Sequence, residues 1–549
     1  MQTYNNNQVL ERIPEGKEDY SAKCVNGTFV GVENEGVVSF KGIPFAKAPI
    51  GNLRWKEPCC TSPDNGIYEA YYNAKSPIQT LADSERASFY EQGEDCLYLN
   101  IWTSSGYQGQ KRPVMVFIHG GNYGWGGTAD PLYDGHNFVK AHPEVVLVVI
   151  TYRIGILGFM DFSAVPGGES YSKSGNLGLL DQVCALKYLQ DNIESFGGDK
   201  SNVTIWGESA GAGSVSLLPL IPEAKGLFHR IIAESGSIAL TSGKEQCLIL
   251  TDKLLKESGA KTMDDLLALS ENQIKKINEK LNDDNNFPER DGIVIPEDVY
   301  GSYKDGIDPN IDILIGTNAD ELRYWISELG SEGLFKYQCR VIPKSHMNFM
   351  TPVEKDNLTA ILKEEAEAIG DKSWAVSEVY NDIYFRLPAI KMAEAHSANG
   401  GNVYMYFWEK PSDIPNMGAC HAVELAYVLN NLEDTIYTGN PADPLIASKV
   451  QEMWVNFAKT GNPSAGDLEW KGYDASSRNT MVIGDEIYQR QEELTKRDEA
   501  LFPLLKYYLT SNTYFIFYNV PIIRKIGILT GFVAVELGSS VRKLFGGKE

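Results

Sequence analysis

Short, uninterrupted runs of apolar residues recur along the chain, and longer stretches of mixed polarity lie between them. Residues 114–118 and 145–150 are apolar at every position, which is typical of strands covered by helices on both faces. Further strands are predicted at residues 94–102, 203–206, 231–233, 311–315 and 403–408. Nearer the N-terminus, residues 29–46 form short apolar segments separated by glycines, which predicts a β-meander.

The stretches between the predicted strands have the pattern of helices. Between residues 177 and 193, apolar side chains recur every three or four positions, the spacing of one helix face. Residues 243–290 are rich in Lys, Glu and Leu, and a late helix over 445–459 ends before Gly461. Strands that alternate with helices predict an α/β fold with one large, mostly parallel central sheet, flanked by helices and carrying helical insertions.

Composition and charge narrow the class of protein. The chain has 549 residues, of which 43% are hydrophobic and 22% charged, as in ordinary globular proteins. Its formal net charge of −23 argues against nucleic acid as a partner, because phosphates attract basic surfaces. The first seven residues are neither basic nor apolar, and eight cysteines are spread thinly. We therefore expect no secretory signal, reduced thiols and a cytoplasmic location.

One pentapeptide stands where a strand meets a helix. Gly207, Glu208, Ser209, Ala210 and Gly211 follow the predicted strand at 203–206 and precede a predicted helix. A serine at the apex of such a sharp turn is the arrangement of a nucleophile elbow. The pattern Gly-x-Ser-x-Gly also occurs by chance in long chains, so the prediction depends on the partners of this serine.

A serine nucleophile needs a base, an acid and donors to the developing oxyanion. His421 lies in a loop beyond the strand at 403–408, whereas His229 and His396 lie next to or within predicted structural elements. His421 is therefore the candidate base. The acid follows the strand at 311–315, where Asp320 and Glu321 are adjacent and local sequence does not choose between them.

The candidate oxyanion donors come from a glycine-rich loop after the strand at 114–118. This loop begins with His119 and two glycines, and backbone N–H groups at such a strand end can point at a developing negative charge. The predicted donors are the N–H groups of Gly121, Asn122 and Ala210. A plain glycine turn is the alternative interpretation.

Over residues 25–505 the chain resembles the type-B carboxylesterases, the cholinesterase-like branch of the α/β-hydrolases. The resemblance rests on four motifs, at residues 40–46, 51–55, 94–100 and 196–211. It implies an α/β-hydrolase catalytic domain with Ser209 as nucleophile, Glu321 as acid and His421 as base. It also implies that Ser235 steadies the His–acid pair from behind.

The chain departs from the family pattern at three places. Asn122 stands where the family usually has Gly or Ala, so we expect its side chain to crowd or hydrogen-bond the acyl group. The upstream cysteine that secreted members pair with the counterpart of Cys96 is absent from residues 74–77. No Trp occurs in residues 76–96, so the choline-binding aromatic residue of cholinesterases has no counterpart. We therefore expect a general carboxylesterase of the bacterial type.

The resemblance implies a serine esterase that hydrolyses small to medium carboxylic esters through an acyl-enzyme, without a cofactor or metal. A non-catalytic binding or adhesion protein on the same fold is one alternative, and a specialist for lipid or aryl esters is another. Outside the catalytic domain we predict an N-terminal extension over 1–24 and an apolar, basic tail over 506–549. For the tail, an amphipathic helix on membranes, a helix packed on the body and a self-association surface stay open.

Overall fold

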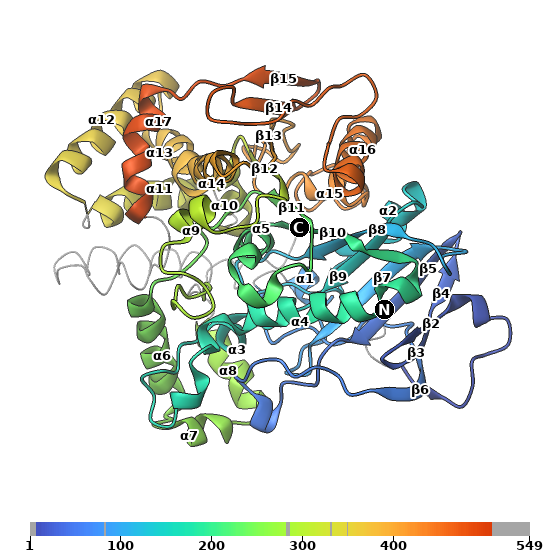
Figure 1. The fold of residues 1–549 in the computed structure, drawn as a ribbon. Helices are drawn as coiled ribbons and strands as arrows, with labels where there is room; N and C mark the ends of the chain where they lie inside the picture. The colour runs from blue at the N-terminus through green and yellow to red at the C-terminus, as the bar shows by residue number, and fades with distance from the viewer. Residues whose placement is uncertain (1–6, 82–83, 282–285, 330–331, 348–349, 508–549) are drawn as a thin grey trace, which may run out of the picture.

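The computed structural model describes residues 7–81, 84–281, 286–329, 332–347 and 350–507 (Figure 1). Within them an 11-stranded sheet has the order β15-β14-β13-β12-β11-β10-β8-β9-β7-β5-β4. The strands from β9 to β14 are parallel, whereas β7, β5, β4 and β15 pair antiparallel at the two edges. The large, mostly parallel sheet predicted from the apolar runs is therefore confirmed. Of the tail predicted over 506–549, residues 508–549 lie outside the described residues, so its predictions of membrane contact, packing and self-association fall there.

The predicted strands lie where the apolar runs placed them. The strands of the large sheet are β4 Val32–Asn34, β5 Val37–Pro44, β7 Tyr98–Ser104, β8 Arg112–Ile118, β9 Val146–Ile150, β10 Gly198–Glu208, β11 Arg230–Glu234, β12 Asp312–Asn318, β13 Val403–Trp408, β14 Asn479–Ile483 and β15 Ile487–Gln491. The edge strands β4 and β15, and β14 beside β15, were not predicted as separate elements, because their sequences are short or mostly polar.

A second, four-stranded sheet lies at the N-terminal end, in the order β1-β6-β3-β2. It consists of β1 Val9–Leu10, β2 Ser21–Cys24, β3 Asn26–Val30 and β6 Asp64–Glu69. The predicted β-meander over 29–46 is therefore wrong: β3 belongs to this small sheet, whereas β4 and β5 form a hairpin at the edge of the large one. Since β1 and β2 pair with β6 and β3, part of the predicted extension over 1–24 is built into the fold.

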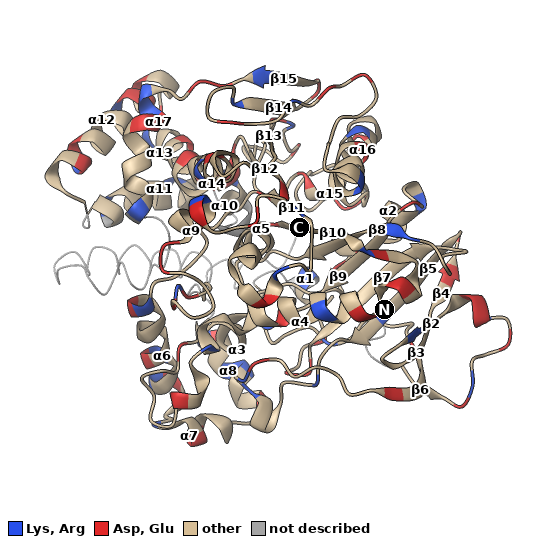
Figure 2. Ribbon diagram, in the orientation of Figure 1, with Lys and Arg blue, Asp and Glu red and all other residues tan. Residues whose placement is uncertain are grey.

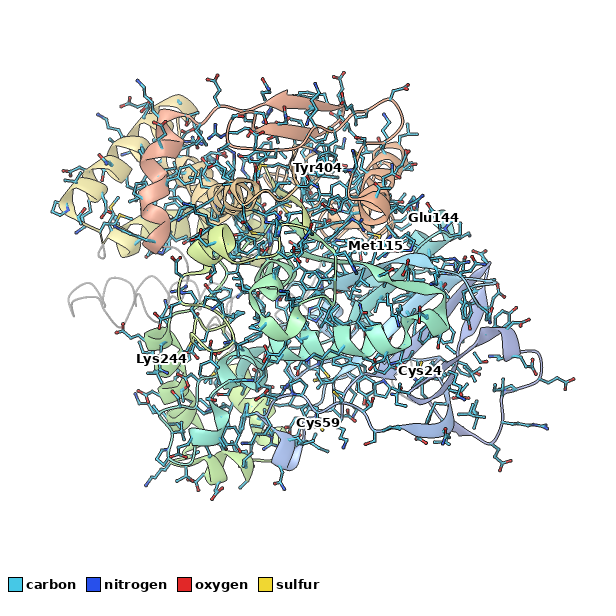
Figure 3. All side chains as sticks on the ribbon, in the orientation of Figure 1. Cys24, Cys59, Met115, Glu144, Lys244 and Tyr404 are labelled. Atoms are coloured by element: carbon cyan, nitrogen blue, oxygen red, sulfur yellow. The ribbon has the colours of Figure 1, made fainter. Side chains whose placement is uncertain are left out.

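Helices cover both faces of the large sheet (Figure 1). Successive side chains of a strand point to opposite faces, so Val114 and Val116 pack in one apolar core and Met115 and Phe117 in another. The first core includes side chains from α4, α5 and α14, and the second includes side chains from α2, α15 and α16. Met115 lies inside the molecule, whereas Glu144 lies at its edge (Figure 3).

The α-helices of the described residues have the following bounds. They are α1 Ser84–Ala87, α2 His136–Ala141, α3 Gly155–Gly158, α4 Leu177–Asn192, α5 Ala210–Leu217, α6 Lys244–Ser258, α7 Met263–Leu267, α8 Glu271–Leu281, α9 Val299–Asp305, α10 Tyr324–Leu329, α11 Glu332–His346, α12 Pro352–Ile369, α13 Lys372–Asn381, α14 Leu387–Ala398, α15 Leu425–Val428, α16 Pro444–Thr460 and α17 Lys496–Leu501. Acidic and basic residues are interspersed on outer helices such as α12 and α17 (Figure 2). Among the described residues, no helix is both long and apolar enough to span a membrane.

Candidate active site

Ser209 occupies the turn between β10 and α5. Its backbone has φ 55° and ψ −121°. Residues other than glycine adopt this conformation only when the surrounding structure imposes it. The N–H of Ser209 donates to the carbonyl of Glu234 on the neighbouring strand β11, at 2.9 Å. This strained turn holds the serine at the carboxyl end of the sheet, as the nucleophile-elbow prediction requires.

The two glycines of the pentapeptide are required by close packing. A Cβ on Gly211 would lie 1.9 Å from the carbonyl oxygen of Ile118, and one on Gly207 would lie 2.5 Å from the backbone of Gly211. Both distances are too short for a side chain, so α5 approaches β8 and β10 only because these positions carry none. The Gly-x-Ser-x-Gly pattern is thus a steric requirement of the turn.

The structure brings His421 to Glu321. Nδ1 of His421 lies 2.6 Å from Oε2 of Glu321, and the other carboxylate oxygen accepts from the N–H of Asn318 at 2.8 Å. Asp320 instead pairs with Arg323 at 2.8 Å and accepts from the N–H of Ala419 at 2.9 Å. Of the two carboxylates that local sequence left open, Glu321 is the one in contact with His421.

The other histidines weighed as bases make structural contacts. Nδ1 of His229 accepts from the N–H of Val203 at 3.2 Å, and Nε2 of His396 lies 2.7 Å from the carbonyl oxygen of Ile311. Each ring ties a strand of the sheet to a neighbouring segment. The structure thus places His229 and His396 in contacts with backbone groups of the sheet.

Glu208, the residue before Ser209, faces the other nitrogen of the imidazole. Its Oε1 lies 3.1 Å from Nε2 of His421, so the histidine is seated directly beside the elbow. Burial alone would lower the pKa of His421, but the carboxylates of Glu208 and Glu321 outweigh burial and raise this pKa to about 9. Burial raises the pKa of Glu208 to about 8. The sequence analysis gave Glu208 no role, although it lies inside the elbow pentapeptide.

Behind this pair, further polar side chains fill the interior. The hydroxyl of Ser235 donates to Oε1 of Glu424 at 3.3 Å, and Nδ2 of Asn318 donates to Oε2 of Glu424 at 2.6 Å. Ser235 is thus connected to Glu321 through Glu424 and Asn318. Burial foremost, and then the carboxylate of Glu321, raise the pKa of Glu424 to about 7. Glu424 and Asn318 were missed because their partners are distant in sequence.

The predicted oxyanion loop lies against the elbow. A Cβ on Gly120 would lie 3.1 Å from Cβ of Ser209 and 2.8 Å from a carboxylate oxygen of Glu208, so a glycine is needed there. Gly121 has φ 94°, and Asn122 has φ 55°. Asn adopts positive φ more readily than most residues, which explains how it replaces a smaller residue at this turn. Ala210 is the first residue of α5, where a helix leaves N–H groups without intrahelical acceptors.

Aromatic rings surround the imidazole of His421. The ring of Phe385 lies 5.0 Å away between centroids, that of Tyr324 5.9 Å and that of Trp325 6.1 Å. Phe385 belongs to a π-helical turn over Asp382–Arg386, a distortion that often occurs at functional sites. These rings give the space next to the candidate base an apolar, aromatic wall. Sequence reasoning missed them because they come from two distant helical segments.

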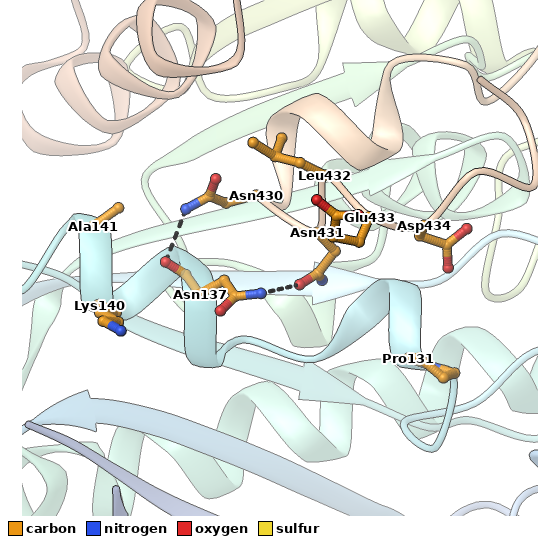
Figure 4. Close-up of a pocket in the computed structure, with 9 residues that line it drawn as sticks. All are labelled: Pro131, Asn137, Lys140, Ala141, Asn430, Asn431, Leu432, Glu433 and Asp434. Carbon is orange, nitrogen blue, oxygen red and sulfur yellow. Dashed lines mark hydrogen bonds between the residues drawn. The ribbon is translucent and has the colours of Figure 1, made fainter. Parts of the chain in front are cut away.

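A surface groove of about 720 Å³ lies between α2 and the loop after α15 (Figure 4). None of Ser209, Glu321 and His421 lines it. Its amides already bond one another: Nδ2 of Asn137 donates to Oδ1 of Asn431 at 3.1 Å, and Nδ2 of Asn430 donates to the carbonyl of Asn137 at 2.9 Å. The groove is therefore separate from the candidate chemistry.

Replacing Glu208 by Gln should shift the pH profile of any reaction that uses His421 as a base. Without this carboxylate the pKa of His421 falls, because a negative charge that stabilises the protonated imidazole is removed. The acidic limb of kcat/KM, which follows loss of a proton from the imidazole, should then move toward lower pH by about one unit. Measuring kcat/KM from pH 5 to 10 checks this. The exposed carboxylate of Glu194 supplies the control, since E194Q should leave the acidic limb of kcat/KM in place. An acidic limb that does not move in E208Q would contradict the role of Glu208 in raising the pKa of His421.

Comparison with known proteins identifies the relatives of this chain. A family model described as "Carboxylesterase family" matches residues 21–502. The para-nitrobenzyl esterase of Bacillus subtilis (strain 168) is 32% identical over 498 residues, covering 87% of this chain and 97% of that protein. Carboxylesterase 1E of Rattus norvegicus is 32% identical over 87% of this chain and 91% of its own length. The carboxylesterase EST55 of Geobacillus stearothermophilus superposes with a TM-score of 0.79 at 30% identity, over 88% of this chain and 100% of that one.

Proposed function

Because the chain belongs to the carboxylesterase family and is a carboxylic-ester hydrolase with the α/β-hydrolase fold, we propose that Ser209, His421 and Glu321 are its catalytic triad. The observation that carries this proposal is the 2.6 Å contact of His421 with Glu321, next to the strained turn that presents Ser209. Serine nucleophiles in nucleophile elbows use an acid and a histidine in this chain order.

In the proposed first step, Oγ of Ser209 attacks the ester carbonyl and His421 accepts its proton. Glu321 fixes the imidazole with the N–H on Nδ1 and stabilises the imidazolium that forms. The carboxyl of Glu208 on the Nε2 side favours the same charged form. His421 then donates its proton to the leaving alcohol, and the acyl group stays on Ser209.

In the second half, water attacks the acyl-enzyme with His421 again as base, and the carboxylic acid leaves. The N–H groups of Gly121, Asn122 and Ala210 are the proposed donors to the oxyanion of both tetrahedral intermediates. Because these are backbone groups, the side chain at position 122 is not needed for this role. It instead adjoins the acyl group and helps to determine acyl size.

The experiment that tests this proposal is rapid mixing of the enzyme with p-nitrophenyl acetate, butyrate and octanoate. A burst of p-nitrophenol close to one equivalent of enzyme, followed by slower turnover, is expected if an acyl-enzyme accumulates. The chain-length dependence then measures the acyl space beside Asn122. A folded protein that releases no alcohol from any of the three would favour the non-catalytic binding function instead.

The aromatic wall around His421 favours esters that carry an aromatic group. Rings of Phe385, Tyr324 and Trp325 can pack against an aryl or benzyl group on the substrate, an interaction of about 1 kcal/mol. One relative is named for para-nitrobenzyl esters. We therefore expect kcat/KM for benzyl acetate to exceed that for cyclohexylmethyl acetate, a ring of similar size without aromatic character, by about fivefold. Equal kcat/KM values for the two esters would contradict a preference for aromatic esters.

We also propose a reducing, cytoplasmic location, supported by the eight cysteines, all of which are free thiols. For the tail, weak membrane contact and self-association are the two proposed roles. Liposome flotation of the full chain and of a chain lacking residues 511–549 distinguishes them. Flotation of the full chain alone supports membrane contact, and soluble fractions for both chains contradict membrane contact.

A further inference from the structure

Two cysteines that are far apart in the sequence meet beside one short segment. Cys60 lies on the connection between β5 and β6 and forms an isolated antiparallel bridge with Ala46. Cys184 lies within α4, and its thiol points at the carbonyl oxygen of Phe45, at 3.9 Å. Since Phe45 and Ala46 are consecutive, both cysteines flank the same stretch of chain. This shared segment, Phe45 and Ala46, places the two cysteines next to each other.

The two thiols differ in their access to solvent. Cys60 is exposed, whereas Cys184 is 5% exposed. Burial foremost, and then the neighbouring Cys60, raise the pKa of the Cys184 thiol, so Cys184 alone is a poor nucleophile. An oxidant from solution can therefore react first with Cys60, and Cys184 is then the neighbouring thiol that can resolve the mixed disulfide. Cys59 lies next to Cys60 on this connection (Figure 3), and its carbonyl accepts from the N–H of Lys47 at 2.8 Å.

We propose that Cys60 and Cys184 form a reversible intramolecular disulfide when the protein meets a disulfide oxidant such as oxidised glutathione. The Cys60 thiolate attacks one sulfur of the oxidant, the S–S bond breaks, and one glutathione thiolate leaves. The sulfur of Cys184 then attacks the sulfur of Cys60, the mixed disulfide breaks, and the second glutathione leaves. The two cysteine protons pass to the two glutathione thiols, so two thiols are oxidised and one disulfide is reduced.

The bond would join α4 to the connection that precedes β6, across about 120 residues of chain. A cross-link of that span restricts the unfolded chain strongly. It leaves Ser209, Glu321 and His421 untouched, because neither cysteine contacts them. The oxidised form should therefore unfold about 4 °C higher than the reduced form, with unchanged ester hydrolysis per molecule.

The test is oxidation of the full chain with oxidised glutathione, followed by alkylation of the remaining thiols and trypsin digestion without reductant. Cys60 lies in the tryptic peptide 57–75 and Cys184 in the peptide 174–187. The expected product is a covalent pair of these peptides, lighter than their sum by two hydrogen atoms. Because peptide 57–75 also holds Cys59, the variant Cys59→Ser must form the same pair, whereas Cys60→Ser and Cys184→Ala must not.

Three outcomes overturn the proposal. One is glutathione retained on Cys60 with no linked peptide, and another is a link that survives in Cys60→Ser. The third is a linked wild-type protein that unfolds at the same temperature as the reduced protein, which contradicts the stabilising role. Since the wild type itself carries the main readout, the result does not depend on whether a variant folds.

Discussion

Replacement of Ser209 by alanine is expected to lower kcat for p-nitrophenyl butyrate by about 10⁵-fold. The reason is chemical: the oxygen that forms the acyl-enzyme is lost, while the oxyanion loop and the pair of His421 with Glu321 remain. Only the residual rate enhancement from binding and from oxyanion donors should persist. Stopped-flow release of p-nitrophenol measures both the turnover and the burst, and the burst should vanish.

Two further variants separate the loss of the Ser209 hydroxyl from the effect of backbone strain at this turn. Ser209→Gly also removes the nucleophile, but glycine adopts the φ of 55° at this turn without strain. It should therefore be as inactive as Ser209→Ala yet more stable to unfolding by about 1 kcal/mol. Ser201→Ala, an exposed serine that bonds Asp199, serves as the active control. Turnover in Ser209→Ala within tenfold of the wild type would exclude Ser209 as nucleophile.

Replacement of Glu321 by Gln is expected to lower kcat by about 10⁴-fold. The amide keeps the size of the side chain but removes its charge, so the imidazolium formed during attack loses its nearest stabilising group. The amide can also present an N–H to Nδ1 of His421, which favours the wrong tautomer. The pKa of His421 should fall as well, because Glu321 is one of the three carboxylates, with Glu208 and Glu424, that raise it. Steady-state kinetics across the pH range measure both effects.

The adjacent carboxylate supplies the matched control. Asp320→Asn loses the pair with Arg323 but leaves the contact of His421 with Glu321 in place, so its kcat should stay within about tenfold of the wild type. A larger loss in Asp320→Asn than in Glu321→Gln would reverse the assignment of the acid. Near-UV circular dichroism of both variants verifies that the fold is intact.

The apolar runs and the glycines determined a large part of this structure locally. Residues 114–118 and 146–150 were predictable as buried strands, because apolar runs this short suit a strand covered on both faces better than a helix. The elbow was also predictable, since its pentapeptide directly follows an apolar run and precedes a helical pattern. These features depend on neighbours along the chain, which is why the sequence reveals them.

Tertiary structure decided the contacts between distant segments. His421 and Glu321 are 100 positions apart, and nothing in the run Asp320-Glu321 tells which carboxylate faces inward. Glu208 became a partner of His421, and Phe385 part of an aromatic wall, only when β10, β12 and the loop after β13 reached the same end of the sheet. The small N-terminal sheet was not predicted for the same reason. Strand pairing depends on two segments at once, so the sequence of one strand does not tell which strand it pairs with.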